Sequence, residues 1–239
     1  MNASLALEEL KGYGKKSRVS DLARFYKTGP GEYAEGDLFL GGTVPQTRSV
    51  AKSYKKLGLA EVQKLFNSPF HEARLCAAII LNLQFKATKS SEERKKIFDF
   101  YLKQVRAERI NNWDIVDVSA PWMGVYLLEV DDPIPLLMKF SKSKSLWQRR
   151  VSIILTFALI RAGDLEPTLL ISEALLQDKE DLIHKAVGWM LRELGKKDVM
   201  LLRSFLANHS HEMPRTMLRY AIEKLPESER KRWLIDSKS

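Results

Sequence analysis

Apolar residues recur at helical spacing along most of this chain of 239 residues. In the stretch 70–84, for example, Ala73, Ala77, Ile80 and Leu81 fall on one side of a helix. No segment alternates apolar and polar residues for long enough to predict a strand. The pattern therefore predicts an all-α protein.

Short turns rich in Pro, Ser, Gly and Asp separate the predicted helices, which arrive in pairs at intervals of a few tens of residues. Such pairs are typical of HEAT-like repeats, in which the second helix of each pair forms a concave face. We expect a single domain over 1–239, a solenoid of antiparallel helical hairpins with a concave basic face. The expected helices cover 2–11, 16–27, 59–66, 70–84, 90–106, 113–120, 123–128, 134–140, 146–162, 167–176, 181–194, 199–207, 214–224 and 227–234.

The charge balance favours a polyanionic partner. Lysine and arginine number 39 against 30 aspartate and glutamate, which gives a net charge of +9 and a pI near 9.5. Nucleic acid and an anionic membrane surface both fit this balance. No apolar run is long enough to cross a membrane, and the first ten residues do not resemble a signal peptide.

A single cysteine, Cys76, excludes an intramolecular disulfide framework and favours a reducing, cytoplasmic location. Its apolar neighbours predict that Cys76 is a small core residue. The sequence indicates no cofactor and no metal site, because its histidines are scattered without a ligand pattern. Two of them, His209 and His211, are expected in a loop.

The most informative run is 110–122, because it places polar groups where a core helix should be apolar. In a helix, Trp113 and Asp117 share a face, whereas Asp114 lies about 100° around the axis. An aromatic plane beside a carboxylate suits a flat or cationic target. The alternative is that Trp113 is a core residue and Asp117 a capping or salt-bridged one.

Three further segments hold candidate binding groups, each with a plain structural alternative. The Gly-rich loop 36–45 leads through Thr43, a predicted N-cap, into a helix that carries Arg48, so that it is either an anion site or a surface loop. The Ser-rich turn 139–145 and the arginines after it form either a phosphate clamp or a solvated turn.

In the helix 181–194, Gly188 predicts close approach by another backbone or by a ligand, because glycine costs about 1 kcal/mol against alanine inside a helix. Trp189 beside it is by default a core residue.

Taken together, these segments resemble the AlkD family of bacterial DNA glycosylases, which are built from HEAT-like repeats. The resemblance runs through nearly the whole chain, in five motifs that occur in the family's order. They are Phe39-Leu40-Gly41 with Pro45 and Arg48, then Ser68-Pro69-Phe70-His71-Glu72-Ala73-Arg74, Asn112-Trp113-Asp114-Ile115-Val116-Asp117, Leu146-Trp147-Gln148-Arg149-Arg150, and Lys185-Ala186-Val187-Gly188-Trp189-Met190-Leu191-Arg192-Glu193.

The resemblance assigns roles to individual residues. The family's catalytic aspartate falls on Asp117, and its two active-site tryptophans fall on Trp113 and Trp189. Its phosphate-gripping arginine falls on Arg150, although a shift of one residue would place it on Arg149. The other expected DNA contacts are Lys142, Lys144, Arg48 and Lys185.

One departure from the family lies near the N-terminus. A family tyrosine corresponds to Phe25, so that its hydroxyl contact is lost or moved to Tyr26.

The resemblance implies a monofunctional glycosylase that hydrolyses the N-glycosidic bond of N3- and N7-alkylated purines in duplex DNA without deep base flipping. It further implies a bacterial cytoplasmic protein that acts as a monomer on double-stranded DNA, with no membrane and no obligate protein partner. A non-catalytic binder of branched or damaged DNA is the alternative, since it explains the charge and the repeats. A HEAT-type protein scaffold explains the repeats only.

Overall fold

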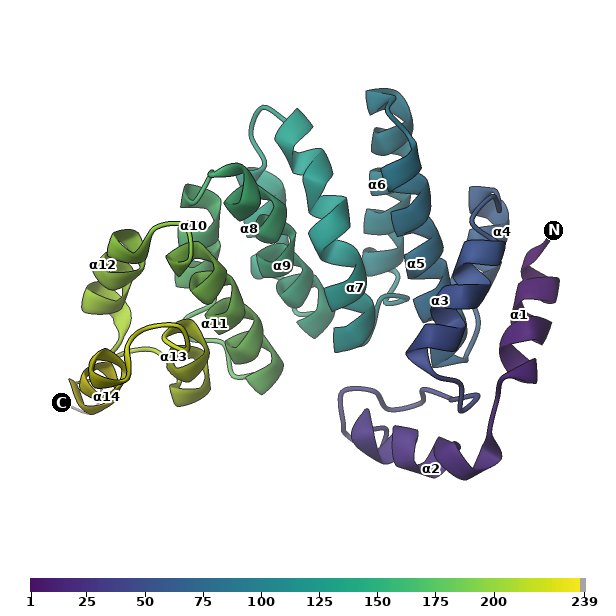
Figure 1. Cartoon of the computed structure of the whole chain (residues 1–239), viewed down its shortest axis with the longest axis horizontal. Coiled ribbons are helices and arrows are strands. Elements are labelled where there is room, and N and C mark those ends of the chain that lie inside the picture. The colour runs from purple at the N-terminus through teal and green to yellow at the C-terminus, as the bar shows by residue number, and fades with distance from the viewer. Residues whose placement is uncertain (237–239) are drawn as a thin grey trace. The chain divides into compact units, whose positions relative to one another are not determined.

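The computed structural model describes residues 1–236 and confirms the all-α prediction. Within these residues the chain forms fourteen α-helices and one 3-10 helix (Figure 1). The described part contains no strand, and its single β-bridge joins Leu38 to Phe70. Successive helices stack in pairs, as the repeat pattern predicted.

The chain divides into two compact units, Met1–Met123 and Gly124–Ser239. The single domain and the concave basic face expected from the sequence stay predictions.

The first unit is organised around α5, because this helix packs against α3, α4, α6 and α7. Thirteen of its seventeen residues are buried, which makes it the core of the unit. The helices of this unit are α1 (Ala3–Gly12), α2 (Lys16–Phe25), α3 (Val44–Ser53), α4 (Leu59–Phe66), α5 (His71–Ala87), α6 (Ser91–Arg106) and α7 (Trp113–Met123). Helix α2 runs crosswise to α3, α5 and α7 (Figure 1).

The second unit has two central helices, α9 and α11, which pack against each other and against most of the others. The unit consists of η1 (Gly124–Glu129), α8 (Ile134–Ser141), α9 (Leu146–Ala162), α10 (Glu166–Ala174), α11 (Asp181–Gly195), α12 (Val199–His209), α13 (Arg215–Ala221) and α14 (Glu227–Asp236).

Side-chain caps explain where several helices begin. Ser90, Ser145 and Asp198 accept a hydrogen bond from a backbone N–H in the first turn of α6, α9 and α12. The predicted N-cap Thr43 is confirmed, and it forms a reciprocal capping box with Gln46 at the start of α3.

The predicted helices lie within three residues of the observed bounds, and three of the departures have an identifiable cause. Helix α2 ends at Phe25 and not at 27, because Lys27 adopts a left-handed backbone (φ +55°) and Thr28 donates to the carbonyl of Ala23. The predicted helix 123–128 is the 3-10 helix η1. The preceding Pro121 lacks the N–H that would continue the α-helical hydrogen bonds, and the 3-10 helix begins three residues later, at Gly124.

The third error concerns His209, which was expected in a loop but is the last residue of α12. Its ring packs on Phe205 one turn earlier, with 4.6 Å between the ring centroids. This contact holds the imidazole against the last turn of the helix.

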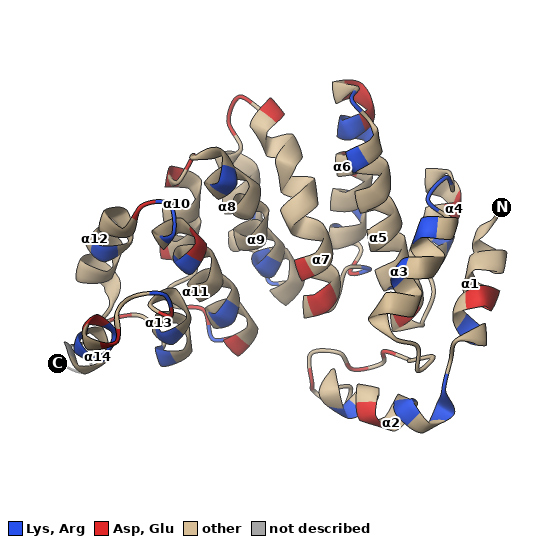
Figure 2. Ribbon diagram, viewed as in Figure 1, with Lys and Arg blue, Asp and Glu red and all other residues tan. Residues whose placement is uncertain are grey.

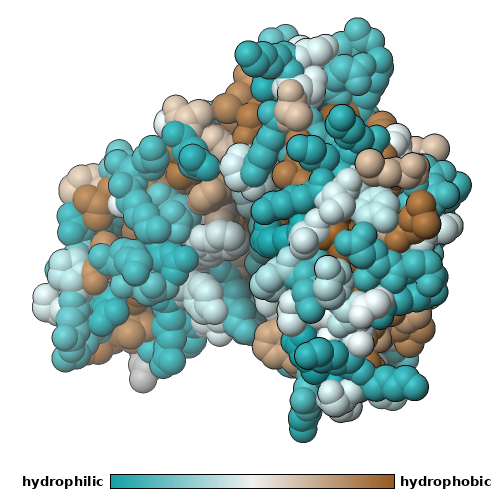
Figure 3. Space-filling model, turned by 45° about the vertical axis from the view of Figure 1, so that its right-hand side comes forward, coloured by the Kyte–Doolittle hydropathy of each residue, from teal (hydrophilic) through white to brown (hydrophobic). Residues whose placement is uncertain are grey.

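Cys76 is fully buried in α5, as predicted, and burial and the charge of Glu9 raise the pKa of its thiol to about 12. On the face seen in Figure 3, hydrophilic residues surround scattered hydrophobic ones. None of the described helices is long and apolar enough to span a lipid bilayer.

Candidate active site

The start of α7 carries the aromatic–acid pair predicted from the sequence. Asn112 precedes the helix, and its carbonyl accepts the first hydrogen bond, from the N–H of Val116. Ile115 and Val116 are fully buried, whereas Trp113 and Asp117 are half-buried. The apolar side of α7 packs on α5, and acidic residues gather at the helix start (Figure 2). Trp113 and Asp117 lie one turn apart on a side that solvent reaches.

Trp113 is the outermost member of a stack of three aromatic rings. Its indole lies on the ring of Tyr26, with 5.6 Å between the centroids and 22° between the planes. Tyr26 also stacks with Phe39, at 5.2 Å and 19°. The three residues come from α7, from the end of α2 and from the loop before α3, so that the stack joins three segments of the first unit.

Asp114, the other acid of the motif, is held by two donors. The hydroxyl of Tyr26 lies 3.0 Å from its Oδ2, and Nε2 of His71 lies 2.8 Å from the same oxygen. The side chain of Asp114 is only 12% exposed. Its carboxylate is therefore committed to contacts inside the first unit.

His71 links Asp114 to a second, deeper acid. Its Nδ1 lies 3.6 Å from Oδ2 of Asp37, and Oδ1 of Asp37 forms an ion pair of 2.6 Å with Nη2 of Arg74. Asn111 closes the arrangement, since it donates to Asp37 at 3.2 Å and accepts from Nε of Arg74 at 3.1 Å. We call Asp37, His71, Arg74, Asn111 and Asp114 the buried charge cluster.

The charges of the cluster determine the protonation of His71. Burial opposes the imidazolium, but the charge of Asp114 and hydrogen bonds to Asp114 and Asp37 outweigh burial and raise the pKa of His71 to about 9. Burial also opposes the carboxylate of Asp37, but His71 and Arg74 hold the pKa of Asp37 below its usual value. His71 and Asp37 are thus charged together at neutral pH.

Phe25 and Tyr26, the residues at the departure noted in the sequence, have different surroundings. Phe25 is 62% exposed and touches Trp113 edge-on, with 5.9 Å between the centroids. Tyr26 is buried, and its hydroxyl reaches Asp114 and not the surface. Burial, with the nearby charge of Asp114, raises the pKa of Tyr26. Tyr26 therefore offers no hydroxyl at the surface, and Phe25 places an apolar ring there.

Asp117 lies outside the buried charge cluster. Its charge acts on the pKa of Tyr101, a fully buried residue of α6. Burial raises the pKa of Tyr101, a hydrogen bond with Ser119 opposes this, and the charge of Asp117 adds to the increase. The side chain of Asp117 is half-buried, and Pro121 provides no N–H to its backbone carbonyl.

The Gly-rich loop before α3 does not present free amides to an anion. The carboxylate of Glu72 accepts hydrogen bonds from the N–H groups of Leu40, Gly41 and Gly42, at 2.9–3.2 Å. The protein thus supplies its own anion at this position. The sequence left two alternatives for this loop, an anion site and a surface loop, and these hydrogen bonds favour the surface loop.

A cavity of about 300 Å³ lies beside the aromatic stack in the first unit. It is mostly apolar, with Tyr26, Phe39 and His71 on one side and the start of α3 on the other. The remaining lining residues are Arg18, Leu22, Gly42, Thr43, Val44, Pro45, Thr47, Glu72 and Leu75.

In the second unit, Trp189 lies half-buried on α11. Its Nε1 donates to Oε1 of Glu193 one turn later, at 3.3 Å, and its ring lies 6.0 Å from that of Phe157. The close approach predicted at Gly188 is confirmed. A Cβ there would lie 2.5 Å from the carbonyl oxygen of Met217 and from Cβ of Tyr220, both on α13.

The two arginines of α9 are both engaged within the second unit. Arg149 forms an ion pair of 2.6 Å with Asp178 and donates to the carbonyls of Ser143 and Lys144. Arg150 is 4% exposed, and its Nη1 donates to the carbonyl of Leu182. Arg149 therefore stabilises the Ser-rich turn, while Arg150 ties α9 to the first turn of α11.

The predicted basic contacts differ in their availability. Arg48, Lys142 and Lys144 are exposed, whereas Lys185 is half-buried and forms an ion pair of 2.7 Å with Asp181. Within residues 1–236, no group of three His, Cys, Asp or Glu side chains could hold a metal ion.

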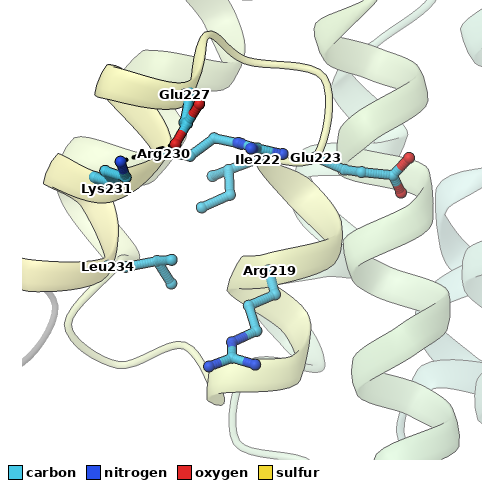
Figure 4. A pocket seen from close by; sticks show the side chains of 7 residues that line it. All are labelled: Arg219, Ile222, Glu223, Glu227, Arg230, Lys231 and Leu234. Carbon is cyan, nitrogen blue, oxygen red and sulfur yellow. Dashed lines mark ion pairs between the residues drawn. The ribbon is translucent and has the colours of Figure 1, made fainter.

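A separate cavity of about 260 Å³ lies between α13 and α14 (Figure 4). Its lining carries charges of both signs, with Lys231 and Glu227 paired at 2.8 Å. None of its lining residues belongs to the site predicted from the sequence. They are Arg219, Ile222, Glu223, Glu227, Arg230, Lys231 and Leu234.

Sequence reasoning did not identify the buried charge cluster. His71 was set aside as one of four scattered histidines, and Asp37 lies 77 positions before Asp114 in a loop. A signal was present in the spacing of His71 and Arg74, which puts both on one side of α5. Two buried cationic side chains in the first turn of a core helix require anionic partners.

Fold and site together define an all-α repeat protein that displays an aromatic–acid pair at the start of one helix. The chain belongs to the family described as DNA alkylation repair enzyme, which matches residues 6–225. The resemblance drawn from the sequence is thereby confirmed. Family membership supports a role in the repair of alkylated DNA, with DNA as the partner.

A solved structure described as a predicted DNA alkylation repair enzyme from Enterococcus faecalis is similar to this chain, with a TM-score of 0.69. The two sequences are 16% identical, and the match covers 90% of this chain and 97% of that chain. At this identity the likeness shows the fold alone. No curated protein matches the chain.

Proposed function

We propose that this protein is a monofunctional DNA glycosylase that hydrolyses the N-glycosidic bond of N3- and N7-alkylated purines in duplex DNA. The observation that carries the proposal is that Trp113 and Asp117 are both half-buried and lie one turn apart on the same side of α7. The other acid of the motif, Asp114, is 12% exposed and accepts from Tyr26 and His71. Asp117 is therefore the acid that shares a solvent-reached side with the indole.

The reaction requires few catalytic groups from the protein. An alkylated purine carries a positive charge, so that it leaves with the electrons of the glycosidic bond while the sugar becomes cationic. The Asp117 carboxylate stabilises this cation and orients a water molecule, whose oxygen bonds to the anomeric carbon. The products are the free base, an abasic sugar and the proton of the attacking water.

Trp113 contributes through its ring face, which attracts positive charge more strongly in the cationic transition state than in the neutral sugar. Phe25 extends this aromatic surface with an exposed edge-on ring. Trp189 is proposed as the second aromatic group on the resemblance alone.

DNA binding is proposed to rest on the exposed basic side chains, and chiefly on Lys142, Lys144 and Arg48. The resemblance adds Arg150, Arg149 and Lys185, which are engaged within the protein. Because phosphate contacts dominate such binding, we expect affinity to fall steeply with salt. An affinity that stays constant between low and moderate salt would contradict this expectation.

The test is the release of 7-methylguanine and 3-methyladenine from methylated duplex DNA, corrected for spontaneous loss. Asp117→Asn should reduce the rate of release by about 10²–10³-fold, as expected for the loss of a charge that stabilises a transition state. DNA affinity should change little. The matched control is Asp99→Asn, which removes an exposed carboxylate that pairs only with Lys95 in the described contacts.

Two results would reject the proposal. If the unaltered protein binds methylated DNA but releases no base above background, it is a non-catalytic binder. If Asp117→Asn lowers DNA affinity and release equally, Asp117 is structural.

A further inference from the structure

We propose that Tyr26, Asp114 and His71 are positioning residues that fix the plane of the Trp113 indole. The catalytic consequence of this inference rests on the proposed function, whereas its structural part does not. The elements involved are the end of α2 and the starts of α5 and α7, which these hydrogen bonds link.

The first step of the argument is the stack itself. Tyr26 stacks with both Phe39 and Trp113, and both ring planes lie within about 22° of its own. A buried ring in contact with two stacked neighbours cannot tilt without displacing one of them. The orientation of Tyr26 therefore determines which plane the indole can adopt.

The second step is the anchor of Tyr26. Its hydroxyl and Nε2 of His71 both donate to Oδ2 of Asp114, at 3.0 Å and 2.8 Å. Asp114 adjoins Trp113 in the chain, so that the anchor and the indole share one stretch of backbone. Tyr26, whose ring supports the indole of Trp113, is thus hydrogen-bonded to Asp114, the residue that follows Trp113.

The third step is the rigidity of His71. Its ring faces Asp114 through one nitrogen and Asp37 through the other, and it packs on Tyr26 and Phe39 with centroids 4.7 Å and 5.0 Å away. Arg74 balances the second acid. An imidazolium that is hydrogen-bonded to one carboxylate and lies 3.6 Å from a second has few other orientations that keep both charges close.

A fixed indole matters because the ring face acts on the developing sugar cation only in one orientation. Preorganised groups cost no reorganisation during the reaction, and a displacement of about 1 Å can reduce a rate about 10²-fold. Phe25 touches the edge of Trp113 but is itself exposed, so that it cannot supply the same constraint.

The experiment compares Tyr26→Phe, which removes one hydroxyl and keeps the stacked ring, with Tyr13→Phe, which removes a hydroxyl at a residue 37% exposed. Asp114→Asn is the stronger variant, and Tyr26→Phe carries the test alone if Asp114→Asn does not fold. Three quantities are measured: the indole ¹⁵N–¹H resonance of Trp113, assigned by its loss in Trp113→Phe, the single-turnover rate of 7-methylguanine release, and the DNA Kd.

We expect Tyr26→Phe to shift or broaden the Trp113 indole resonance and to reduce the rate of release by about 10–100-fold, with Kd within about twofold. Tyr13→Phe should change none of these quantities. An unchanged resonance in Tyr26→Phe overturns the proposal, and so does an equal loss of rate and affinity. If the unaltered protein releases no base, the proposed function fails, while the resonance still decides whether Tyr26 positions the indole.

Discussion

The two tryptophans that the sequence singled out are held in place by different forces. Trp113 rests on a ring that is anchored to a buried cluster of four charges drawn from α5, α7 and the loop before α3. Trp189 is held by one hydrogen bond to Glu193 on its own helix and by apolar neighbours. The difference teaches that the surroundings of Trp113 depend on charge, whereas those of Trp189 depend on close packing.

The largest effect is expected from breaking the buried ion pair. Arg74→Ala removes the ion-pair partner of Asp37, whose carboxylate is left with His71 and Asn111. The side chains of Asp37 and Arg74 are only 5% exposed. The free energy of unfolding should fall by about 3–5 kcal/mol, as for other buried pairs that lose one partner. Urea unfolding measures this.

The matched variant in the second unit is Glu193→Gln, which removes the charge beside Trp189 but keeps an acceptor for its N–H. Glu193 pairs with Lys196, whose side chain is 45% exposed, and at 3.6 Å with Arg192, which keeps Glu223 as a partner, so that the loss should not exceed about 1 kcal/mol. Equal losses for Arg74→Ala and Glu193→Gln would remove the distinction between the two surroundings.

A pH dependence should follow from His71. Its pKa is raised from 6.5 to about 9 on folding, so that the folded state holds its proton more tightly than the unfolded state does. The stabilisation, up to about 3 kcal/mol, is present in full below pH 6.5 and is lost as the pH rises through 9.

Urea unfolding of the unaltered protein and of His71→Gln between pH 6 and 9.5 measures this effect. The unaltered protein should lose stability over this range, and the variant should lose much less. Parallel curves for the two proteins would show that His71 does not carry the dependence.

A change in packing should destabilise the second unit, where the loss of a charge is expected to have little effect. Gly188→Ala places a methyl group 2.5 Å from the backbone of α13, where it has no room. We expect a loss of about 1–3 kcal/mol, with no change in its pH dependence. Gly12→Ala is the control, since a Cβ there meets nothing within 4 Å and alanine favours the helix.

The smallest effect on stability is expected at the exposed lysines of the Ser-rich turn. The double variant Lys142→Ala with Lys144→Ala should change the free energy of unfolding by no more than about 0.5 kcal/mol. If both lysines contact phosphates, the slope of log K against log salt should become shallower by about 1.8.

Arg149→Ala should act in the reverse manner, because this arginine holds the turn and Asp178 within the protein. Its loss should lower stability, and DNA affinity should change mainly through the displaced turn. A fall in affinity with no loss of stability would instead make Arg149 a direct phosphate contact.

The sequence by itself determined the helices, because apolar periodicity, Thr43 and short Pro and Ser turns are local signals that tertiary contacts here reinforce. It also brought Trp113 and Asp117 together, since residues four positions apart on a helix are neighbours by geometry. Gly188 predicted its own close contact, because a glycine inside a helix needs a reason to be there.

Only the tertiary structure decided which charged side chains pair with each other inside the protein. Asp37, His71 and Asp114 come from separate segments, and nothing local to any of them shows that folding buries all three together. The same holds for Glu72, which accepts from loop N–H groups thirty or more positions away, and for Arg149, which pairs with Asp178. Long-range pairing of charges depends on where the helices pack, and helical periodicity carries no information about it.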